Sequence, residues 1–234
     1  MASTSRRRHW DRRAPTYDAS MEWVERRLFK DTRPWVARRA HGHTLEVAIG
    51  TGANLPHYQP EVELTGTDFS GPMLDLARVR AQQLGRSVTL HQADAMGLPF
   101  ADASFDCVVS TFSLCCVPRE RTVIGEMLRV LRPGGQLLLA DHVPSSRWPL
   151  RGLQRMADVA TVPWHGEHFS RRPLSILRGM GVTVVETERL SQGIVERVHA
   201  VKAAKTACRA KTHVVNVEEH RKGGGPIHEE ASDM

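Results

Sequence analysis

A glycine turn and two aspartates are the residues whose types and spacing point most directly to chemistry. The run Leu45-Glu46-Val47-Ala48-Ile49 is mostly apolar and stops at Gly50-Thr51-Gly52. This pattern predicts a buried strand that breaks into a tight loop and opens a helix, which is the usual ligand edge of an open α/β sheet. Glycine serves there because it accepts positive φ and lets a ligand approach the backbone closely.

The glycine turn does not fit the common phosphate-binding patterns. A dinucleotide fold would need a third small residue in the frame G-x-G-x-x-G, where this chain has Leu55. A P-loop would need a Gly-Lys-Ser/Thr ending, and none follows. A ligand without phosphate, such as a nucleoside with a polar tail, fits better. A purely structural turn stays open on these residues alone.

The two aspartates follow the next two predicted strands. Asp68 ends the strand 62–68, about twenty residues past the turn, where such a sheet places an acid for ribose hydroxyls. Asp94 follows the strand 88–92. Its carboxylate could accept a hydrogen bond from the exocyclic amine of an adenine, or could only cap the turn in which it lies. Ser70 is placed to cap the following helix, which runs to about Leu84. Met73 on that helix would point back towards the adenosine side.

The elements that must position these residues alternate along the chain. After the strands already described, the pattern predicts strands over 107–112 and 136–140 and a helix over 119–131. Repeated strand–helix alternation implies a parallel, doubly wound sheet. Strands at 182–187 and 194–201 follow a helix over 173–180. Two amphipathic helices, at 18–30 and from Pro34 to about Arg39, precede the first strand.

Composition bounds the kind of protein. The chain has 234 residues, of which 41% are hydrophobic and 25% charged, as expected for one α/β domain with extensions. Five arginines and one aspartate within residues 1–13 supply a net +4 of the formal +6. Such an arm could touch nucleic acid or an anionic membrane. We expect instead a solvated, poorly ordered terminus.

The four cysteines, Cys107, Cys115, Cys116 and Cys208, have no C-x-x-C spacing. They indicate buried thiols in a reducing compartment. The adjacent pair Cys115-Cys116 could hold a thiophilic ligand such as arsenic, but such a site needs separated cysteines that converge, so packing is the preferred interpretation. The sequence shows no signal peptide and no apolar run of membrane-spanning length, which predicts a cytoplasmic protein.

The order of these pieces resembles the class I S-adenosylmethionine-dependent methyltransferases, in the type 11 group that includes ubiquinone/menaquinone C-methyltransferases and phospholipid N-methyltransferases. The resemblance covers about residues 10–202. Locally, residues 106–117 and 126–143 are most similar to thiol S-methyltransferase-like proteins. Ala48 and Ile49 depart from the group, which usually has Gly and a small residue there. The motifs that carry the resemblance are Trp10-Asp11-x-x-Ala14-x-x-Tyr17-Asp18, Glu46 to Gly52, Thr67-Asp68-Phe69-Ser70, Ala93-Asp94-Ala95, Leu98-Pro99-Phe100, Ser104-Phe105-Asp106 and Arg129 to Gly135.

The resemblance implies a Rossmann-like, seven-stranded, mostly parallel sheet with an antiparallel C-terminal hairpin and an N-terminal helical lid. We therefore expect a basic arm and lid helices over residues 1–40 and a cofactor-binding domain over 41–203. The composition beyond Lys202 shows little apolar periodicity and predicts a flexible tail over 204–234. The implied cofactor is S-adenosyl-L-methionine, with S-adenosyl-L-homocysteine as product. Its expected binding residues are Tyr17, Glu46, Gly50, Thr51, Gly52, Asn54, Asp68, Phe69, Ser70, Met73, Asp94, Ala95 and Thr111.

Methyl transfer from a sulfonium needs orientation, exclusion of water and, for some acceptors, removal of a proton. The acceptor side should come from the N-terminal helix, the loop 113–117 and the less regular residues 141–173. Histidine titrates near neutrality, so His142, His165 and His168 are the candidate bases, each of which could equally be an ordinary surface histidine. Asp141 and Glu167 lie among them. The spacing His165-x-x-His168 is too common to predict a metal site, and none is expected.

The expected partner is a small-molecule acceptor: a thiol, phenol, quinone or natural-product intermediate. A phospholipid amine methyltransferase on a membrane surface is an alternative, as is a non-catalytic cofactor-binding scaffold. Methylation of a nucleic-acid base is disfavoured, because Ser110-Thr111-Phe112-Ser113 stands where those enzymes carry Asn/Asp-Pro-Pro-Tyr/Phe. The sequence leaves the oligomeric state and the acceptor atom open.

Overall fold

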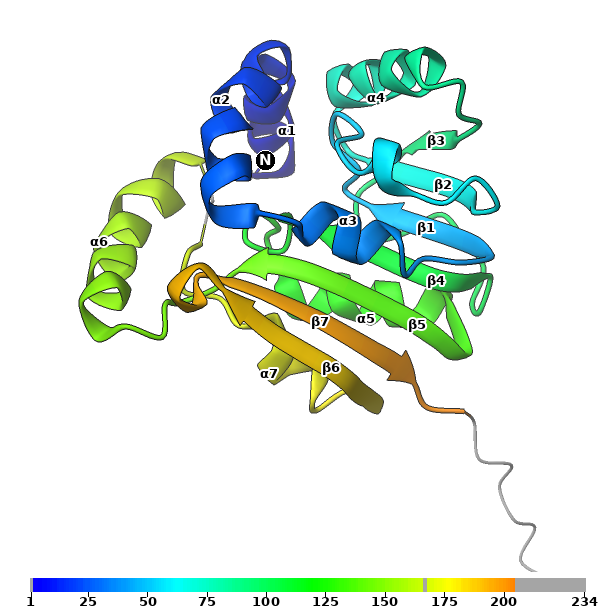
Figure 1. The fold of residues 1–234 in the computed structure, drawn as a ribbon. Coiled ribbons are helices and arrows are strands. Elements are labelled where there is room, and N and C mark those ends of the chain that lie inside the picture. The colour runs from blue at the N-terminus through cyan, green and yellow to red at the C-terminus, as the bar shows by residue number, and fades with distance from the viewer. Residues whose placement is uncertain (1, 166–167, 205–234) are drawn as a thin grey trace, which may run out of the picture. The chain divides into compact units, whose positions relative to one another are not determined.

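Seven strands form one sheet in the computed structural model, which describes residues 2–165 and 168–204. The strand order is β3-β2-β1-β4-β5-β7-β6, and β7 runs antiparallel to both of its neighbours (Figure 1). The other pairings are parallel. The strands are β1 (His43–Val47), β2 (Glu63–Asp68), β3 (Thr89–Gln92), β4 (Phe105–Thr111), β5 (Leu131–His142), β6 (Val182–Leu190) and β7 (Val195–Lys202). This confirms the predicted mostly parallel sheet with an antiparallel C-terminal hairpin.

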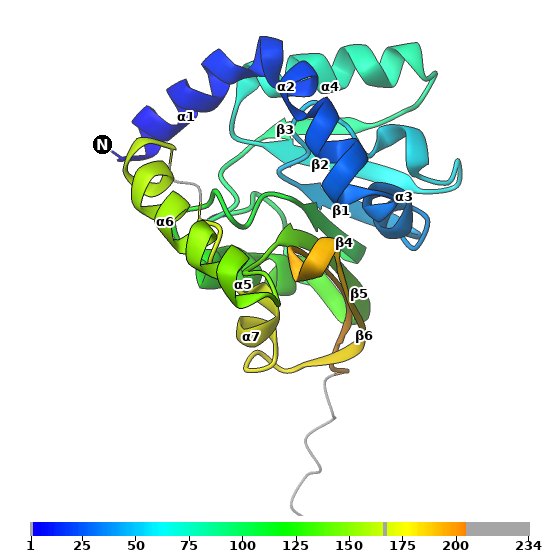
Figure 2. The same ribbon diagram turned by 60° about the vertical axis from the view of Figure 1, so that its left-hand side comes forward.

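Helices precede, connect and flank these strands (Figures 1 and 2). The α-helices are α1 (Ala2–Arg13), α2 (Tyr17–Val24), α3 (Thr32–Ala37), α4 (Gly71–Gln83), α5 (Glu120–Val130), α6 (Trp148–His165) and α7 (Pro173–Leu177). The short turns are η1 (Ala14–Thr16), η2 (Glu25–Phe29, a π-helical turn), η3 (Leu55–His57) and η4 (Ser191–Gly193). None of the helices in the described residues is long and apolar enough to cross a membrane.

The central strands are apolar on both faces because helices cover both. Residues 107–109 of β4 are buried and alternate between two clusters. Val108 packs with Ile124 and Met127 of α5, whereas Val109 packs with Val36 of α3 and Leu74 of α4. Parallel strands buried on both faces read as near-continuous apolar runs, which is why the sequence pattern located them.

Several predicted boundaries hold and others shift for local reasons. Ser70 caps α4 as predicted, its side chain accepting a hydrogen bond from the backbone of Met73. β5 begins earlier than predicted, because Leu131 pairs with Phe105 before the Gly134-Gly135 segment. The helix predicted over 18–30 is divided after Val24. The π-helical turn η2 follows and ends before Lys30, whose φ is 51°.

The prediction of a poorly ordered N-terminus is wrong for residues 2–13, which form α1. Two contacts anchor this helix. Asp11 accepts a hydrogen bond from the Ser70 hydroxyl at 2.6 Å, and the Trp10 ring packs edge-on against Tyr17 at 6.0 Å. A helix with few apolar residues is therefore stabilised by contacts near its C-terminal end rather than by an apolar stripe.

The segment 141–173 is also more regular than predicted, since residues 148–165 form α6. Proline at 149 is compatible with the first turn of a helix, where its missing N–H costs nothing. The predicted flexible tail lies outside the described residues from position 205 onward.

The core assignment can be tested at Leu138, which is fully buried at the centre of β5. Leu138→Ala should lower the free energy of unfolding by about 2–5 kcal/mol, through lost burial and the cavity it leaves. Urea denaturation measures the change. Val185→Ala on β6, where the side chain is 58% exposed, is the matched control and should change it little. Equal losses for the two variants would contradict this core.

Candidate functional site

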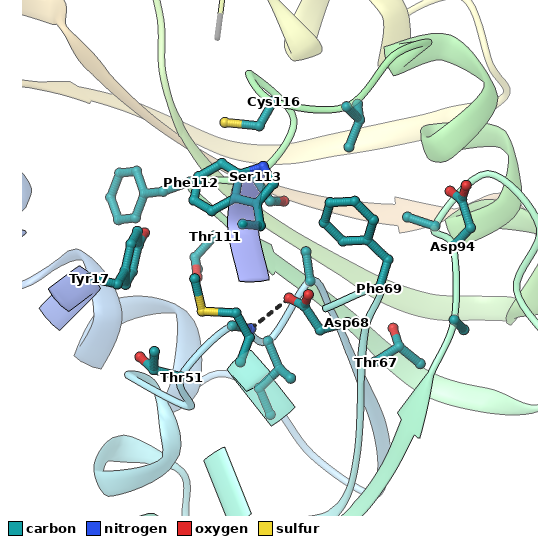
Figure 3. Close-up of a pocket in the computed structure, with 18 of the residues that line it drawn as sticks. Tyr17, Thr51, Thr67, Asp68, Phe69, Asp94, Thr111, Phe112, Ser113 and Cys116 are labelled. Carbon is teal, nitrogen blue, oxygen red and sulfur yellow. Dashed lines mark hydrogen bonds between the residues drawn. The ribbon is translucent and has the colours of Figure 1, made fainter. Parts of the chain in front are cut away.

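A cavity opens where the parallel strands β1, β2 and β4 and the loop after β3 end, on the edge that the sequence predicted (Figure 3). It contains roughly 990 Å³ of empty space, counting the part open to solvent. Its lining comes from the carboxyl ends of those strands, from α1 and α2, and from the loop after β4. The lining residues are Arg6, Trp10, Tyr17, Arg33, Ala48, Ile49, Gly50, Thr51, Ala53, Thr67, Asp68, Phe69, Met73, Ala93, Asp94, Ala95, Thr111, Phe112, Ser113, Cys116, Val117 and Pro118.

The glycine turn forms one wall of the cavity. Gly50 and Gly52 have φ of 58° and 77°, a region that strains other residues. A Cβ on Gly52 would lie 2.6 Å from Leu55, so this glycine permits tight local packing. A Cβ on Gly50 would meet no atom within 4 Å. Gly50 therefore serves the backbone conformation and leaves its side of the cavity open. Ala48 also has positive φ, 58°, at the position where the resembling group usually has glycine.

Asp68 connects the ends of β1 and β2. Its carboxylate accepts hydrogen bonds from the backbone N–H of Gly50 at 3.0 Å and of Ser70 at 2.9 Å. Burial raises the pKa of Asp68 to about 6, although these backbone hydrogen bonds oppose the rise. The two contacts fix the carboxyl group at the cavity wall, where its remaining lone pairs can accept from a ligand's hydroxyls.

Asp94 lies at the other end of the same wall, with Phe69 and Ala95 (Figure 3). It is solvent-exposed, and its carboxylate accepts a hydrogen bond from the backbone of Met96 at 2.9 Å. An aromatic ring, small side chains and an acceptor along one wall suit a flat heterocycle with an amino group. Met73 adds a buried apolar side chain to the same cavity.

Behind the glycine turn lies a buried polar network. Glu46 accepts from the Asn54 amide at 2.7 Å and from the Tyr58 hydroxyl at 2.8 Å. The Asn54 amide also donates to the Thr111 hydroxyl at 3.0 Å, which joins β1, the turn and β4. Burial raises the pKa of Glu46 to about 7, with both hydrogen bonds and the nearby Arg33 acting against the rise.

Arg33 connects this network to the N-terminal helices. Its guanidinium pairs with Glu25 and donates to the Asn54 side-chain oxygen at 3.1 Å and to Thr111 at 3.3 Å. It also lies 5.3 Å from the centroid of the Phe112 ring. Tyr17 lines the same part of the cavity, and burial raises its pKa. A buried cation beside a phenol can receive an anionic ligand group.

The expected binding residues divide into two sets. Nine contribute to the cavity lining: Tyr17, Gly50, Thr51, Asp68, Phe69, Met73, Asp94, Ala95 and Thr111. Four lie outside the lining, namely Glu46, Gly52, Asn54 and Ser70, and each is bonded or packed to a lining residue or its neighbours. Their contacts are those of residues that hold the wall in place.

Two of the candidate histidines, His142 and His168, lie apart from this lining. His142 ends β5, and its ring stacks on Phe169 with centroids 4.9 Å apart. His168 donates its backbone N–H to the carbonyl of Cys115 at 2.9 Å, and burial together with Arg171 lowers its pKa. Neither is among the lining residues of the described cavity. His165 ends α6, and its side chain lies outside the described residues.

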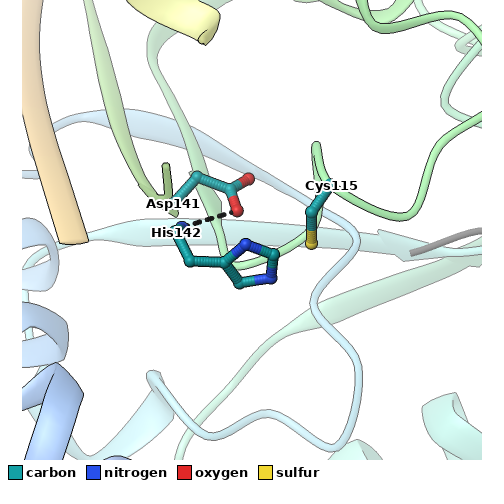
Figure 4. Close-up of side chains that lie close together, drawn as sticks. All are labelled: Cys115, Asp141 and His142. Carbon is teal, nitrogen blue, oxygen red and sulfur yellow. Dashed lines mark hydrogen bonds between the residues drawn. The ribbon is translucent and has the colours of Figure 1, made fainter. Parts of the chain in front are cut away.

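A small cluster lies beside His142 (Figure 4). Ligand atoms of Cys115, Asp141 and His142 lie within 4.8 Å of one another, close enough for a metal ion. The Asp141 carboxylate, however, accepts the backbone N–H of Leu114 at 2.7 Å and of His142 at 2.9 Å. These bonds join the loop after β4 to β5, which gives the cluster a structural role.

Several lining residues were missed by the sequence analysis. Arg6 and Trp10 are four residues apart on α1, a spacing that would have placed them on one helix face had a helix been expected. Phe112 was not singled out, whereas Cys116 lies in the loop 113–117 that the sequence analysis assigned to the acceptor side. Arg33 carried no signal of its own, because nothing in the sequence shows that it pairs with Glu25, eight residues earlier, and contacts Asn54 and Thr111, which are 21 and 78 residues later.

Comparison with known proteins agrees with this geometry. Residues 45–139 match a family described as a methyltransferase domain. A phosphatidylethanolamine N-methyltransferase from Cereibacter sphaeroides is 35% identical over 181 residues, 76% of this chain and 87% of that protein. A demethylmenaquinone methyltransferase from Thermus thermophilus is 31% identical over 165 residues, 65% of this chain and 73% of that protein. A crystal structure from Bacillus halodurans, described as a methyltransferase, superposes with a TM-score of 0.63 at 19% identity over 74% of this chain and 98% of that one.

The chain therefore belongs to the class I S-adenosylmethionine-dependent methyltransferases, in the type 11 group. Its methyl donor is S-adenosylmethionine. The structural likeness establishes the fold, and the sequence relatives establish the family.

The buried carboxyl of Glu46 gives the first test of the site. Its pKa is raised in the folded protein, so the folded state binds this proton more tightly than the unfolded state. This group's contribution therefore lowers the free energy of unfolding as pH rises from about 4.5 towards 7. Glu46→Gln removes the titration, so the free energy of unfolding of the variant minus that of the wild type should increase over this range.

Urea denaturation at several pH values measures this difference. Glu61→Gln, at an exposed position on the loop before β2, is the control and should show a constant difference. A Glu46→Gln difference that does not change with pH would contradict the buried, proton-binding carboxyl.

Proposed function

We propose that the cavity binds S-adenosylmethionine with its ribose at Asp68 and its adenine between Phe69 and Asp94. The amino-acid end would extend towards Tyr17 and Arg33, whose guanidinium suits a carboxylate. The residues present fit this ligand: an oriented carboxyl at a strand end, an open glycine wall and a buried cation are its three requirements. The Asp68 carboxyl, held by the N–H groups of Gly50 and Ser70, is the observation that carries the assignment.

The bound donor supplies a methyl group on a positively charged sulfur. The chain must then orient an acceptor and keep water away. Phe112 stacks on Phe29 with centroids 3.5 Å apart, which joins the loop after β4 to η2 over the cavity. Because Trp10 and Tyr17 also line the cavity, α1 and α2 act as the lid that excludes water.

We further propose a partly apolar small-molecule acceptor of the phenol, quinone or thiol kind. The loop after β4 lines its end of the cavity with Phe112, Cys116 and Val117. The carboxylates among the described lining residues are Asp68 and Asp94, both assigned to the donor, whereas Arg6 and Arg33 are cations. Arg33 is paired with Glu25 and assigned to the donor's carboxylate, so Arg6 is the cation left for the acceptor's part of the lining, where it disfavours a cationic amine and favours a neutral or acidic acceptor. The demethylmenaquinone methyltransferase relative supports the quinone choice.

A phospholipid amine is the second candidate, supported by the phosphatidylethanolamine methyltransferase relative. For an acceptor that must lose a proton, His142 is the proposed base, with His165 and His168 as alternatives. His142 adjoins Cys115, next to the lining residue Cys116, and its Nδ1 is buried with no hydrogen-bond partner among the described residues. The oligomeric state does not enter this proposal.

Donor binding tests the role of Asp68. Asp68→Asn should raise the dissociation constant of S-adenosylhomocysteine about 10- to 100-fold, because a charged hydrogen bond contributes about 1.5–3 kcal/mol. The wild type should lose about tenfold affinity between about pH 7 and pH 5, as the carboxyl with a pKa of about 6 becomes protonated. Titration calorimetry measures both.

The asparagine variant should lose most of this pH dependence. Asp75→Asn, on the outer side of α4, is the matched control and should bind like the wild type. Unchanged affinity in Asp68→Asn would contradict the assignment of the ribose site.

Transfer of a tritiated methyl group tests the acceptor class. A demethylated quinone, phosphatidylethanolamine and a hydrophobic thiol are supplied one at a time, each in vesicles of otherwise the same composition. We expect more label in the organic extract with the quinone or thiol than with the phospholipid. The Asp68→Asn variant should lose this labelling. Label mainly in the phospholipid would favour the second candidate. Donor binding with no transfer to any acceptor of the panel would favour the non-catalytic scaffold.

A further inference from the structure

Helix α6 is attached to the rest of the protein through polar side chains. Gln154 accepts the backbone N–H of Ser145 at 2.7 Å and donates to the carbonyl of Val143 at 3.1 Å. One turn later, Asp158 accepts the backbone N–H of Phe169 at 2.6 Å. Gln154 and Asp158 are four residues apart, so they define the face of α6 that meets the domain.

The other face of α6 is apolar and open to solvent. Trp148, Leu153, Met156 and Val159 are 82%, 62%, 71% and 77% exposed. At 100° per residue these four side chains fall on one side of the helix, opposite the attached face. A helix of a globular protein normally buries its apolar face and exposes its polar one, and α6 does the reverse. An exposed apolar face of this kind marks a binding surface.

Positive charge borders this face. Arg147 and Arg155 lie just before α6 and in its N-terminal half, and both are exposed, whereas Arg151 is half-buried and donates to the carbonyls of Ser145 and Ser146. The acidic residue in the described part of the helix, Asp158, points inward and is already hydrogen-bonded. The surface therefore combines apolar side chains, a tryptophan and uncompensated arginines. This combination is typical of helices that lie in the interface of an anionic bilayer.

The place of α6 in the fold links it to the site. β5 ends at His142, and the chain reaches α6 after five residues. Ser145 and Ser146 at its root bond to Gln192 of η4, and Ser191 of η4 donates to the carbonyl of Leu28 in η2, next to the lid. Figure 2 shows α6 at the outside of the domain, with its C-terminal end near the N-terminal end of α1. A surface bound at α6 would lie close to the lid.

We propose that the outward face of α6 docks the enzyme on anionic lipid bilayers, from which the proposed apolar acceptor is taken. The choice of acceptor rests on the proposed function, whereas the docking rests on α6 alone. A second copy of the chain fits the face less well, because a symmetric contact would bring the exposed Arg147 and Arg155 of the two copies against one another. A bilayer with acidic headgroups compensates them.

Vesicle flotation tests the docking with the full chain. Vesicles of phosphatidylcholine are compared with vesicles that also contain phosphatidylglycerol, at low and high salt. We expect preferential, salt-sensitive flotation with the anionic vesicles. The triple variant Trp148→Ser/Met156→Ser/Val159→Ser should reduce bound protein at least fivefold, and Arg147→Gln/Arg155→Gln should weaken binding to the anionic vesicles. Val185→Ser, which removes an exposed apolar side chain from β6 instead of α6, should bind like the wild type.

Calorimetry with S-adenosylhomocysteine is the control for the fold and the donor site of the triple variant. Unchanged donor affinity in the triple variant shows that it is folded and that the donor site is intact. Flotation that does not depend on α6 would overturn the proposal. The proposal would also be overturned if the wild-type protein did not float and sedimentation showed that it forms a dimer which the triple variant does not form. If flotation depends on α6 but no lipid-soluble acceptor is methylated, the docking stands and the proposed acceptor fails.

Discussion

The buried contact of Asn54 with Glu46, Thr111 and Arg33 is the constraint on which the rest of the site depends. Each partner comes from a different element: β1, β4 and the start of α3. Removing one member would leave buried polar or charged groups without partners, at about 1–3 kcal/mol each. The network therefore holds the glycine turn, the end of β4 and the N-terminal lid in one arrangement, and it does so from behind the cavity. The residues that face the ligand can stay open because others keep the turn rigid.

The sheet edge that lines the cavity could be predicted from sequence because its determinants are local. A strand that ends in Gly50-Thr51-Gly52, and an aspartate at the end of the next strand, act through backbone conformation and position in the sheet. The Ser70 cap and the strands buried on both faces are equally local. The sequence could not show that Glu46 and Asn54 point away from the ligand, because that depends on which neighbours cross behind the turn.

The missed elements are those stabilised by single distant contacts. α1 has no apolar stripe, and its anchors are Asp11 on Ser70 and Trp10 on Tyr17. The apolar face of α6 points to solvent and its polar face to the domain, so a search for a helix with a buried apolar face does not find it. In the proposed function, both lie on the side of the protein that receives the acceptor. In this family the donor is constant and the acceptor varies, so the sequence is most informative about the part of the site that is shared.

The most direct test of the account is a crystal structure with S-adenosylhomocysteine bound. We predict the ribose hydroxyls at the Asp68 carboxylate, the adenine beside Phe69 and Asp94, and the amino-acid carboxylate facing Arg33, with the Asn54 network unchanged from the apo protein. A nucleoside bound elsewhere would contradict the account. An amino-acid end directed away from Arg33 and Tyr17 would contradict it as well.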